Sequence, residues 1–343
     1  LMAIFFFVVG LEVKREMVTG ELRDAKRAAL PVLAAIGGMV VPAGIYLLLQ
    51  GGTVAARGWG IPMATDIAFV VGCMAVLGPR VPRIMRVMLL SIAIIDDIGA
   101  ILVIAIGYTE SLNMTALLLA FGGLALVYGL GRAGVRSFGI YVLIGAGVWF
   151  GFHESGVHAT IAGVLMGLLT PARSYLGENT VSELIRRADK TLHGGEWVNM
   201  HHRSDAVRKF TDNVREVISP LEYLEGTLHP WTSFVIMPIF ALANAGVPFT
   251  MADFGEPVAL AIMTGLVIGK PVGILLMSFL AVKLVTKTLP EGLTWPAMLG
   301  GGFLSGIGFT MALFISGLAL SGPVLQTAKV GVLGASLLAA VLG

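Results

Sequence analysis

Hydrophobic residues occur in long stretches along most of this chain, and short polar segments separate them. A helix that crosses a bilayer needs about 20 mostly apolar residues. Most of the stretches approach that length, although those at 138–152 and 157–170 are shorter, so the pattern predicts repeated membrane-spanning helices. They lie near 28–50, 58–78, 85–107, 114–131, 138–152, 157–170, 230–249, 257–282, 296–319 and 323–342.

The first apolar stretch, 1–11, is too short to span a bilayer alone. As a helix it would reach only about 16 Å, at ~1.5 Å per residue. It has neither a starting Met nor a cleavable signal pattern. We therefore expect the chain to begin inside a helix, with its first span truncated.

Composition supports the membrane assignment. The chain is 56% hydrophobic and 13% charged, whereas soluble domains carry about 25% charged residues. Its single cysteine excludes an intrachain disulfide framework. The net charge of +2 gives no reason to expect nucleic-acid binding.

Basic residues concentrate in every second polar segment. The intervening segments carry Glu110, Glu154, Asp253 and Glu256, with Arg57 as the basic exception. By the positive-inside rule, this alternation predicts that the basic loops are cytoplasmic. The basic segments lie near 12–27, 80–86, 132–136, 171–228 and 283–287.

The chain divides into three parts by polarity. We expect N-terminal membrane helices over 1–170, a cytoplasmic segment over 171–228 and C-terminal membrane helices over 229–343. Mixed charge at helical spacing predicts cytoplasmic helices at 182–192 and 205–218. His201 and His202 lie there, and solvated surface is a better interpretation of them than a metal site.

Two spans contain helix-weakening residues at membrane depth, in 58–69 and 300–312. By their order in the chain they run in opposite directions, as in transporters with inverted repeats and crossing broken helices. The glycines could instead permit close helix packing. For 300–312 alone the two readings are even, but Asp66 in the other span favours broken helices.

Four charged residues lie well inside predicted spans: Asp66, Asp96, Asp97 and Lys270. Insertion scales assign a charged residue at the bilayer centre a cost of roughly 2.5–3.5 kcal/mol. Side chains of adjacent helical residues diverge by ~100°. One of Asp96 and Asp97 can therefore pair with Lys270 while its neighbour faces an aqueous funnel. A second lysine, Lys329, can snorkel to the interface.

These residues suggest two roles. A hard cation such as Na⁺ or Li⁺ prefers oxygen ligands: a free carboxylate, the Thr65 hydroxyl and unwound carbonyls. Protons compete for the same oxygens, which couples the two fluxes. Asp66 and Lys270 could instead neutralise the facing ends of broken helices, and for Asp66 we favour this role over direct ion ligation.

The chain closely resembles the NhaA-type sodium/proton antiporters. The shared motifs run in family order over nearly the whole chain: GLEVKRE at 10–16, PMATDIAF at 62–69, AIIDDIGA at 93–100, SGVHAT at 155–160, LHPW at 228–231, FALANAG at 240–246, GKP at 269–271 and GIGFTM at 306–311. Because this family is itself a standard example of inverted repeats, the fit to that pattern is not independent.

The resemblance implies an all-α polytopic secondary transporter of twelve helices, with two broken helices crossing near Asp66. It implies Asp97 as the Na⁺ or Li⁺ ligand, Asp96 as the partner of Lys270, and Thr65 nearby. It implies electrogenic, pH-regulated exchange of Na⁺ or Li⁺ for a larger number of protons across a bacterial inner membrane, serving sodium and alkaline pH homeostasis. No cofactor is implied.

The resemblance also implies a pH-sensing cluster, although the residues alone favour ordinary charge at the membrane edge. Its members would be Glu12, Arg15, Glu16, Glu225 and His229. The longer protein is expected to form a homodimer. The segment 171–228 is longer than the family's usual loop, and Gly226 stands where a second histidine is common, so an altered pH profile is expected. His158 is expected to pack rather than sense pH.

Three other classes compete with an antiporter. An intramembrane aspartyl protease needs its two aspartates on different helices, which adjacent Asp96 and Asp97 cannot provide. A light-driven pump with a Schiff base on Lys270 would need seven spans, fewer than the pattern predicts. In addition, Lys270 is followed directly by Pro271. A sodium symporter for an organic solute is the nearest alternative, but no clamp for a solute is evident.

Overall fold

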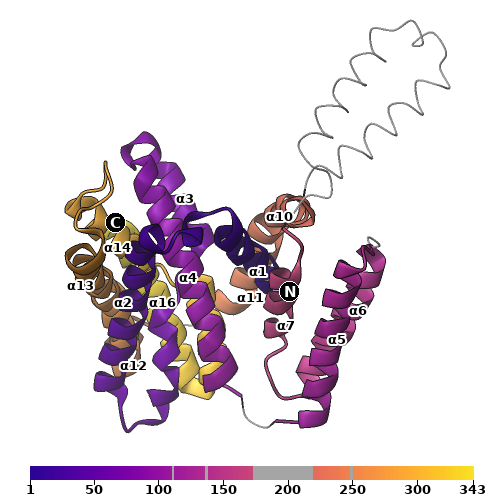
Figure 1. Cartoon of the computed structure of the whole chain (residues 1–343). Coiled ribbons are helices and arrows are strands. Elements are labelled where there is room, and N and C mark those ends of the chain that lie inside the picture. Colours follow the sequence, from indigo (N-terminus) through magenta and orange to yellow (C-terminus); the bar gives the residue numbers. More distant parts are fainter. Residues whose placement is uncertain (110–111, 136–137, 173–218, 248–249) are drawn as a thin grey trace, which may run out of the picture.

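The computed structural model describes residues 1–109, 112–135, 138–172, 219–247 and 250–343. Within these ranges the chain is helical and contains no β-strand. Figure 1 shows most of the helices standing side by side along one common direction. The predicted helices at 182–192 and 205–218, with His201 and His202, lie outside the described residues.

The first half of the chain supplies seven α-helices and the first arm of one broken span. In order they are α1 (Met2–Val18), α2 (Ala25–Gln50), the 3₁₀ helix η2 (Val54–Met63), α3 (Ile67–Leu77), α4 (Arg83–Gly107), α5 (Met114–Arg132), α6 (Phe138–Glu154) and α7 (Thr160–Leu169). Short 3₁₀ turns, η1 (Glu21–Arg23) and η3 (Gly78–Arg80), join α1 to α2 and α3 to α4.

The second half contains two long spans with π-helical turns, the other broken span and a final helix. In order they are α10 (Pro220–Trp231), η5 (Thr232–Ile236), α11 (Met237–Ala245), η6 (Met251–Gly255), α12 (Pro257–Thr264), η7 (Gly265–Gly269), α13 (Lys270–Ala281), η8 (Val282–Thr286), α14 (Trp295–Ser305), α15 (Phe309–Ala319) and α16 (Gly322–Leu342).

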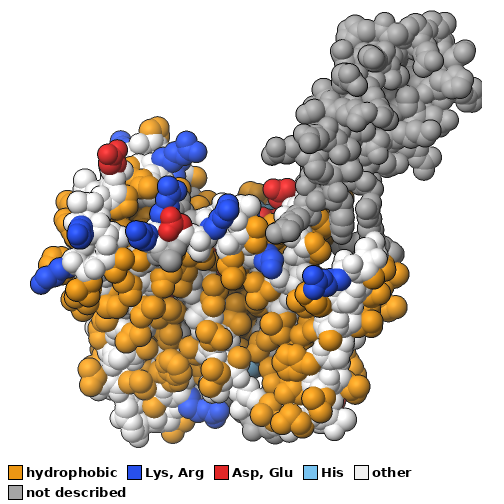
Figure 2. All heavy atoms as spheres, viewed as in Figure 1, with side chains coloured by type: hydrophobic (Ala, Val, Ile, Leu, Met, Phe, Trp, Pro, Cys, Tyr) orange, Lys and Arg blue, Asp and Glu red, His pale blue; other side chains and the backbone are white. Residues whose placement is uncertain are grey.

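The prediction of an all-α membrane protein is confirmed. In the described part of the chain, six helices are long and apolar enough to cross a bilayer, and two bent helix pairs bring the number to eight. Figure 2 shows hydrophobic side chains over a broad band along the helices. Most of the visible Lys and Arg side chains lie at the edge near α3 and α10.

Two long spans differ in detail from the apolar pattern. The first begins at Pro220, ten residues before the apolar stretch, because Ser219 and Glu222 form a capping box that starts the helix early. In both spans a π-helical turn, η5 or η7, ends two residues before a proline, Pro238 or Pro271. Proline cannot donate the usual backbone hydrogen bond, so the local ladder is rearranged there.

Glycine contacts bring two helix pairs close together. α2 meets α13 where a Cβ on Gly273 would lie 2.1 Å from the Gly37 carbonyl oxygen. α1 meets α7 through Gly10 and Gly167 in the same way. α5 and α6 pack mainly on each other and on α7. Lys270 is the first residue of α13, so the close α2–α13 contact fixes the position of Lys270 relative to α2.

Candidate ion-binding site

The two broken spans meet at their breaks. η2 and α3 are bent by 42°, and α14 and α15 by 46°. The Asp66 backbone N–H donates to the Ile307 carbonyl at 2.7 Å, and the Thr65 hydroxyl lies 3.0 Å from the Ser305 carbonyl. Each break therefore satisfies backbone groups that the other leaves open, which is the condition for irregular backbone at membrane depth.

Asp66 is fully buried and caps two helices at once. Its Oδ1 accepts from the Phe69 backbone N–H at 3.2 Å, at the start of α3. Its Oδ2 accepts from the Thr310 backbone N–H at 3.0 Å and from the Thr310 hydroxyl, at the start of α15. One carboxylate thus lies at two positive helix ends, where negative charge is stabilised.

Lys270 joins the other arm of the first break to α4. Its Nζ lies 3.0 Å from Asp96 Oδ2 and also donates to the Met63 carbonyl. Met63 is the last residue of η2, so the ammonium lies at a negative helix end. The Thr65 hydroxyl lies 2.7 Å from the same Asp96 oxygen. Thr65, Asp96 and Lys270 are all buried.

Asp97 is in a different environment from Asp96. Its side chain is buried, yet neither carboxylate oxygen accepts a hydrogen bond from the residues that the structure describes. Asp96 Oδ1 is also without such a donor. A buried carboxylate is expensive to keep unless something positive neutralises it. A proton or a bound cation satisfies that requirement at Asp97.

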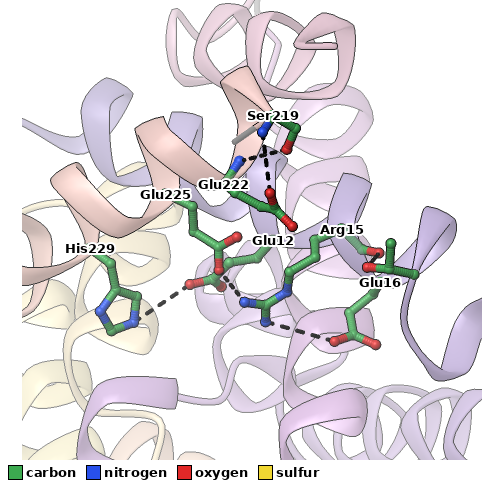
Figure 3. Close-up of polar contacts among 8 residues, drawn as sticks. Glu12, Arg15, Glu16, Ser219, Glu222, Glu225 and His229 are labelled. Carbon is green, nitrogen blue, oxygen red and sulfur yellow. Dashed lines mark hydrogen bonds and ion pairs between the residues drawn. The ribbon is translucent and has the colours of Figure 1, made fainter. Parts of the chain in front are cut away.

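A second group of charged residues joins α1 to α10, and we call it the α1–α10 cluster (Figure 3). Arg15 forms an ion pair with Glu225 and lies 3.8 Å from Glu16. His229 Nε2 lies 3.7 Å from Glu12 Oε1. The carboxylates are largely buried, at 10–17% side-chain exposure, whereas Arg15 and His229 are 43% and 56% exposed. Several ionisable groups are therefore coupled at short range.

Sequence reasoning missed three polar groups at the breaks. The hydroxyl of Thr310 and the carbonyls of Met63 and Ser305 all contact residues that had been singled out. Thr310 follows the break at Gly306 and Gly308, so a hydroxyl beside a weakened helix was the available signal. Carbonyl contacts carry no sequence signal, because every residue has a carbonyl.

Other candidates lie away from the breaks. Lys329, on α16, is half-buried and has no ion pair with any described residue. His158 lies just before α7 and has an interaction of its own.

Comparison with known proteins agrees with this geometry. The model of the family described as Na⁺/H⁺ antiporter 1 matches residues 1–343. Proteins named Na(+)/H(+) antiporter NhaA, from Rhodopirellula baltica and Rhizobium meliloti, are 56% and 50% identical to the chain. Both comparisons cover 100% of this chain and 78% of the relative.

A relative from Vibrio vulnificus, named Na(+)/H(+) antiporter NhaA 2, is 44% identical over 100% of the chain and 76% of its own length. The relatives are transporters rather than enzymes, and the apolar helices agree with a multi-pass bacterial membrane protein. On this sequence match, and with two broken helices meeting at buried carboxylates, the chain belongs to the Na⁺/H⁺ antiporter 1 family.

Proposed function

We propose that this chain exchanges intracellular Na⁺ or Li⁺ for external protons, with Asp97 as the principal ion ligand. The observation that carries this proposal is that Asp97 is buried and accepts no hydrogen bond from the described residues. A carboxylate in that environment is stable when it is protonated or when it holds a cation. Mutually exclusive occupation of one carboxylate couples the two fluxes in opposite directions.

Further oxygen groups lie around Asp96, the residue before Asp97. The Thr65 hydroxyl lies between Asp96 Oδ2 and the Ser305 carbonyl. Hard monovalent cations prefer such carboxylate, hydroxyl and carbonyl oxygens over nitrogen or sulfur. The composition of the site therefore suits Na⁺ and Li⁺, and both ions are proposed as substrates.

Electrogenic exchange follows from the number of carboxylates. Asp96 and Asp97 can each take a proton, whereas one Na⁺ or Li⁺ carries a single charge. Lys270 neutralises Asp96 in the deprotonated state through the 3.0 Å ion pair. If both carboxylates are protonated on one side and release their protons on the other, more protons than cations cross per cycle.

Asp66 has a supporting role in this mechanism. Its carboxylate is already occupied by the Phe69 and Thr310 donors. We therefore propose that it neutralises the N-terminal ends of α3 and α15 and does not ligate the ion directly.

The α1–α10 cluster is proposed to regulate exchange by pH. Glu12, Glu16 and Glu225 repel one another, while Arg15 and His229 lie within 4 Å of members of the group. A proton gained or lost by one member changes the charge felt by the others. Because the cluster links α1 to α10, such a change alters the contact between these helices.

Membrane orientation and physiological role are part of the same proposal. The alternating basic loops support a cytoplasmic location for the α1–α10 cluster, by the positive-inside rule. Export of Na⁺ in exchange for protons would lower internal sodium and acidify an alkaline cytoplasm.

Ion flux in proteoliposomes tests this function. The chain is reconstituted with an acid-inside pH gradient, and the collapse of the gradient is recorded on adding Na⁺, Li⁺ or K⁺ near alkaline pH. We expect collapse with Na⁺ and Li⁺ but not K⁺, and a faster rate when a K⁺/valinomycin clamp removes the opposing membrane potential. Collapse that requires an added organic solute would instead favour a symporter.

A further inference from the structure

The arm that leads into the ion site has an unusual conformation. η2 is a 3₁₀ helix of ten residues, Val54–Met63, and Thr65 follows two residues later. Runs of 3₁₀ helix longer than three or four residues are uncommon, because their hydrogen-bond geometry is poorer than that of an α-helix. Contacts from neighbouring elements are therefore needed to hold this arm in its present length and register.

Two buried tyrosines provide such contacts at the N-terminal end of η2. The Tyr46 hydroxyl, from α2, donates to the Ala55 carbonyl at 2.8 Å. The Tyr108 hydroxyl, from the residue after α4, donates to the Arg57 carbonyl at 2.9 Å. The two tyrosines are 0% and 5% exposed. A buried hydroxyl aimed at a backbone carbonyl fixes the position of that carbonyl.

The sequence of η2 makes room for both hydroxyls. A Cβ on Gly58 would lie 2.6 Å from the Tyr46 hydroxyl oxygen. A Cβ on Gly60 would lie 3.0 Å from the Tyr108 hydroxyl oxygen. Glycine at these two positions therefore lets each tyrosine approach the backbone of the arm.

The end of η2 next to the ion site, at Met63, is held by a different side chain. The Lys270 ammonium donates to the Met63 carbonyl, and the same ammonium pairs with Asp96. A 3₁₀ helix rises about 2.0 Å per residue and an α-helix about 1.5 Å. Relaxation of ten residues toward an α-helix would therefore shift one end by about 5 Å, far more than an ion site tolerates.

We propose that Tyr46 and Tyr108 are positioning residues for ion exchange. They hold the N-terminal end of η2, and this sets where the Met63 carbonyl, Lys270 and Thr65 lie relative to Asp96 and Asp97. Neither tyrosine touches the ion itself. The inference rests on the proposed antiport function, because the geometry that the tyrosines control is that of the ion site.

The test uses Tyr46→Phe, Tyr108→Phe and the double variant, which remove only the hydroxyls. Tyr141→Phe is the matched control. The Tyr141 hydroxyl, from α6, also donates to a backbone carbonyl, that of Val135 at 2.8 Å, but Val135 precedes α6 and is not part of η2. In proteoliposomes we expect each single variant to raise the apparent KM for Na⁺ about fivefold, with the maximal rate changed less than about twofold. The double variant should raise it further, and the control should match the wild type.

Hydrogen–deuterium exchange of the purified protein gives a readout that does not depend on transport. Peptides covering 54–63 should exchange at least about fivefold faster in the double variant than in the wild type or Tyr141→Phe. Peptides from α5 and α6 should be unchanged. This result tests whether the two tyrosines hold η2, even if the chain transports no ion.

The two measurements separate the possible failures. Wild-type protein that moves no Na⁺ would reject the proposed function. The hydrogen–deuterium exchange rates over 54–63 would still show whether the two tyrosines hold η2. Active variants with an unchanged KM would overturn the positioning role, as would unchanged exchange over 54–63. A lower maximal rate with an unchanged KM and reduced folded yield would assign the tyrosines to stability alone.

Discussion

At the scale of single residues, Asp96 and Asp97 are neighbours on α4 in unlike surroundings. Asp96 is paired with Lys270 and lies beside the Thr65 hydroxyl, whereas Asp97 has no donor among the described residues. Their side chains diverge by ~100° around the helix, which is enough to direct them to different partners. The two carboxylates can consequently serve different steps of exchange.

Replacing Asp97 by Asn should abolish exchange without destabilising the protein. An amide cannot trade a proton for a cation, so the rate should fall by at least about 100-fold. Removing a buried carboxylate that lacks a donor removes a desolvation penalty, so the melting temperature should stay constant or rise. Glu256→Gln, at an exposed carboxylate before α12, is the control and should leave both quantities unchanged. Sodium-dependent proton flux that persists in Asp97→Asn would contradict the assignment of Asp97 as the ion ligand.

Replacing Lys270 by Ala should lower stability, because it leaves Asp96 and the Met63 carbonyl without their buried donor. Loss of one partner from a buried ion pair typically costs about 3–5 kcal/mol. Thermal melting in detergent measures the loss. The double variant Lys270→Ala/Asp96→Asn should recover part of it, since it removes the stranded charge as well. An unchanged melting temperature in Lys270→Ala would mean that the pair contributes nothing.

At the scale of elements, the position of Lys270 depends on how closely α13 approaches α2. Gly37 and Gly273 lie at that contact, and each would place a Cβ 2.1 Å from the other's carbonyl oxygen. A backbone oxygen cannot move aside as a flexible side chain can. The contact therefore tolerates no larger residue, and the ion site depends on it.

Gly273→Ala should separate α2 from α13 and reduce the folded fraction in detergent. Gly44→Ala, also on α2, is the matched control, because nothing lies within 4 Å of the Cβ it would add. That control should be neutral or slightly stabilising, since alanine is the better helix former by roughly 0.5–1 kcal/mol. Size-exclusion profiles and melting curves compare the two. Equal melting temperatures would show that the helices can separate without loss of stability.

At the scale of the whole molecule, the α1–α10 cluster connects two helices that are more than 200 residues apart in the sequence. Ion pairs near the surface of a protein contribute little to stability on average. Coupled carboxylates can nevertheless set the pH at which a contact changes. The cluster is therefore better tested through the pH profile than through stability.

Glu225→Gln should move the rising limb of the exchange profile to lower pH, by up to about one unit. Burial raises the pKa of Glu12, and the negative charge of Glu225 raises it further. Removing that charge lowers the pKa of Glu12, so this carboxyl loses its proton at lower pH. Glu222→Gln is the control on the same helix, because glutamine retains the capping box with Ser219. A profile that shifts equally in both variants, or in neither, would contradict the sensor assignment.

Much of the architecture could be predicted from the sequence because its cause is local. Long apolar stretches predict spans wherever they occur, since each helix must satisfy its own backbone groups in lipid. Both interruptions were predicted from glycine, proline and hydroxyl residues, and the breaks lie inside the predicted segments 58–69 and 300–312. The early start at Pro220 was missed because its first turns are polar and depend on capping.

The sequence by itself determined that this is a membrane protein with an adjacent carboxylate pair and Lys270 inside apolar spans, and it favoured two interrupted helices. Those features follow from which residue types stand at which spacing. Spacing alone leaves open which carboxylate pairs with Lys270, and the family resemblance implies Asp96. Only the tertiary structure shows the Lys270–Asp96 ion pair itself, the contact of Asp66 with Thr310 on α15, and the contacts of Tyr46 and Tyr108 with η2. Each of these contacts joins segments that are distant in sequence or meets a backbone carbonyl. Such contacts depend on how closely the helices pack, which hydropathy does not specify.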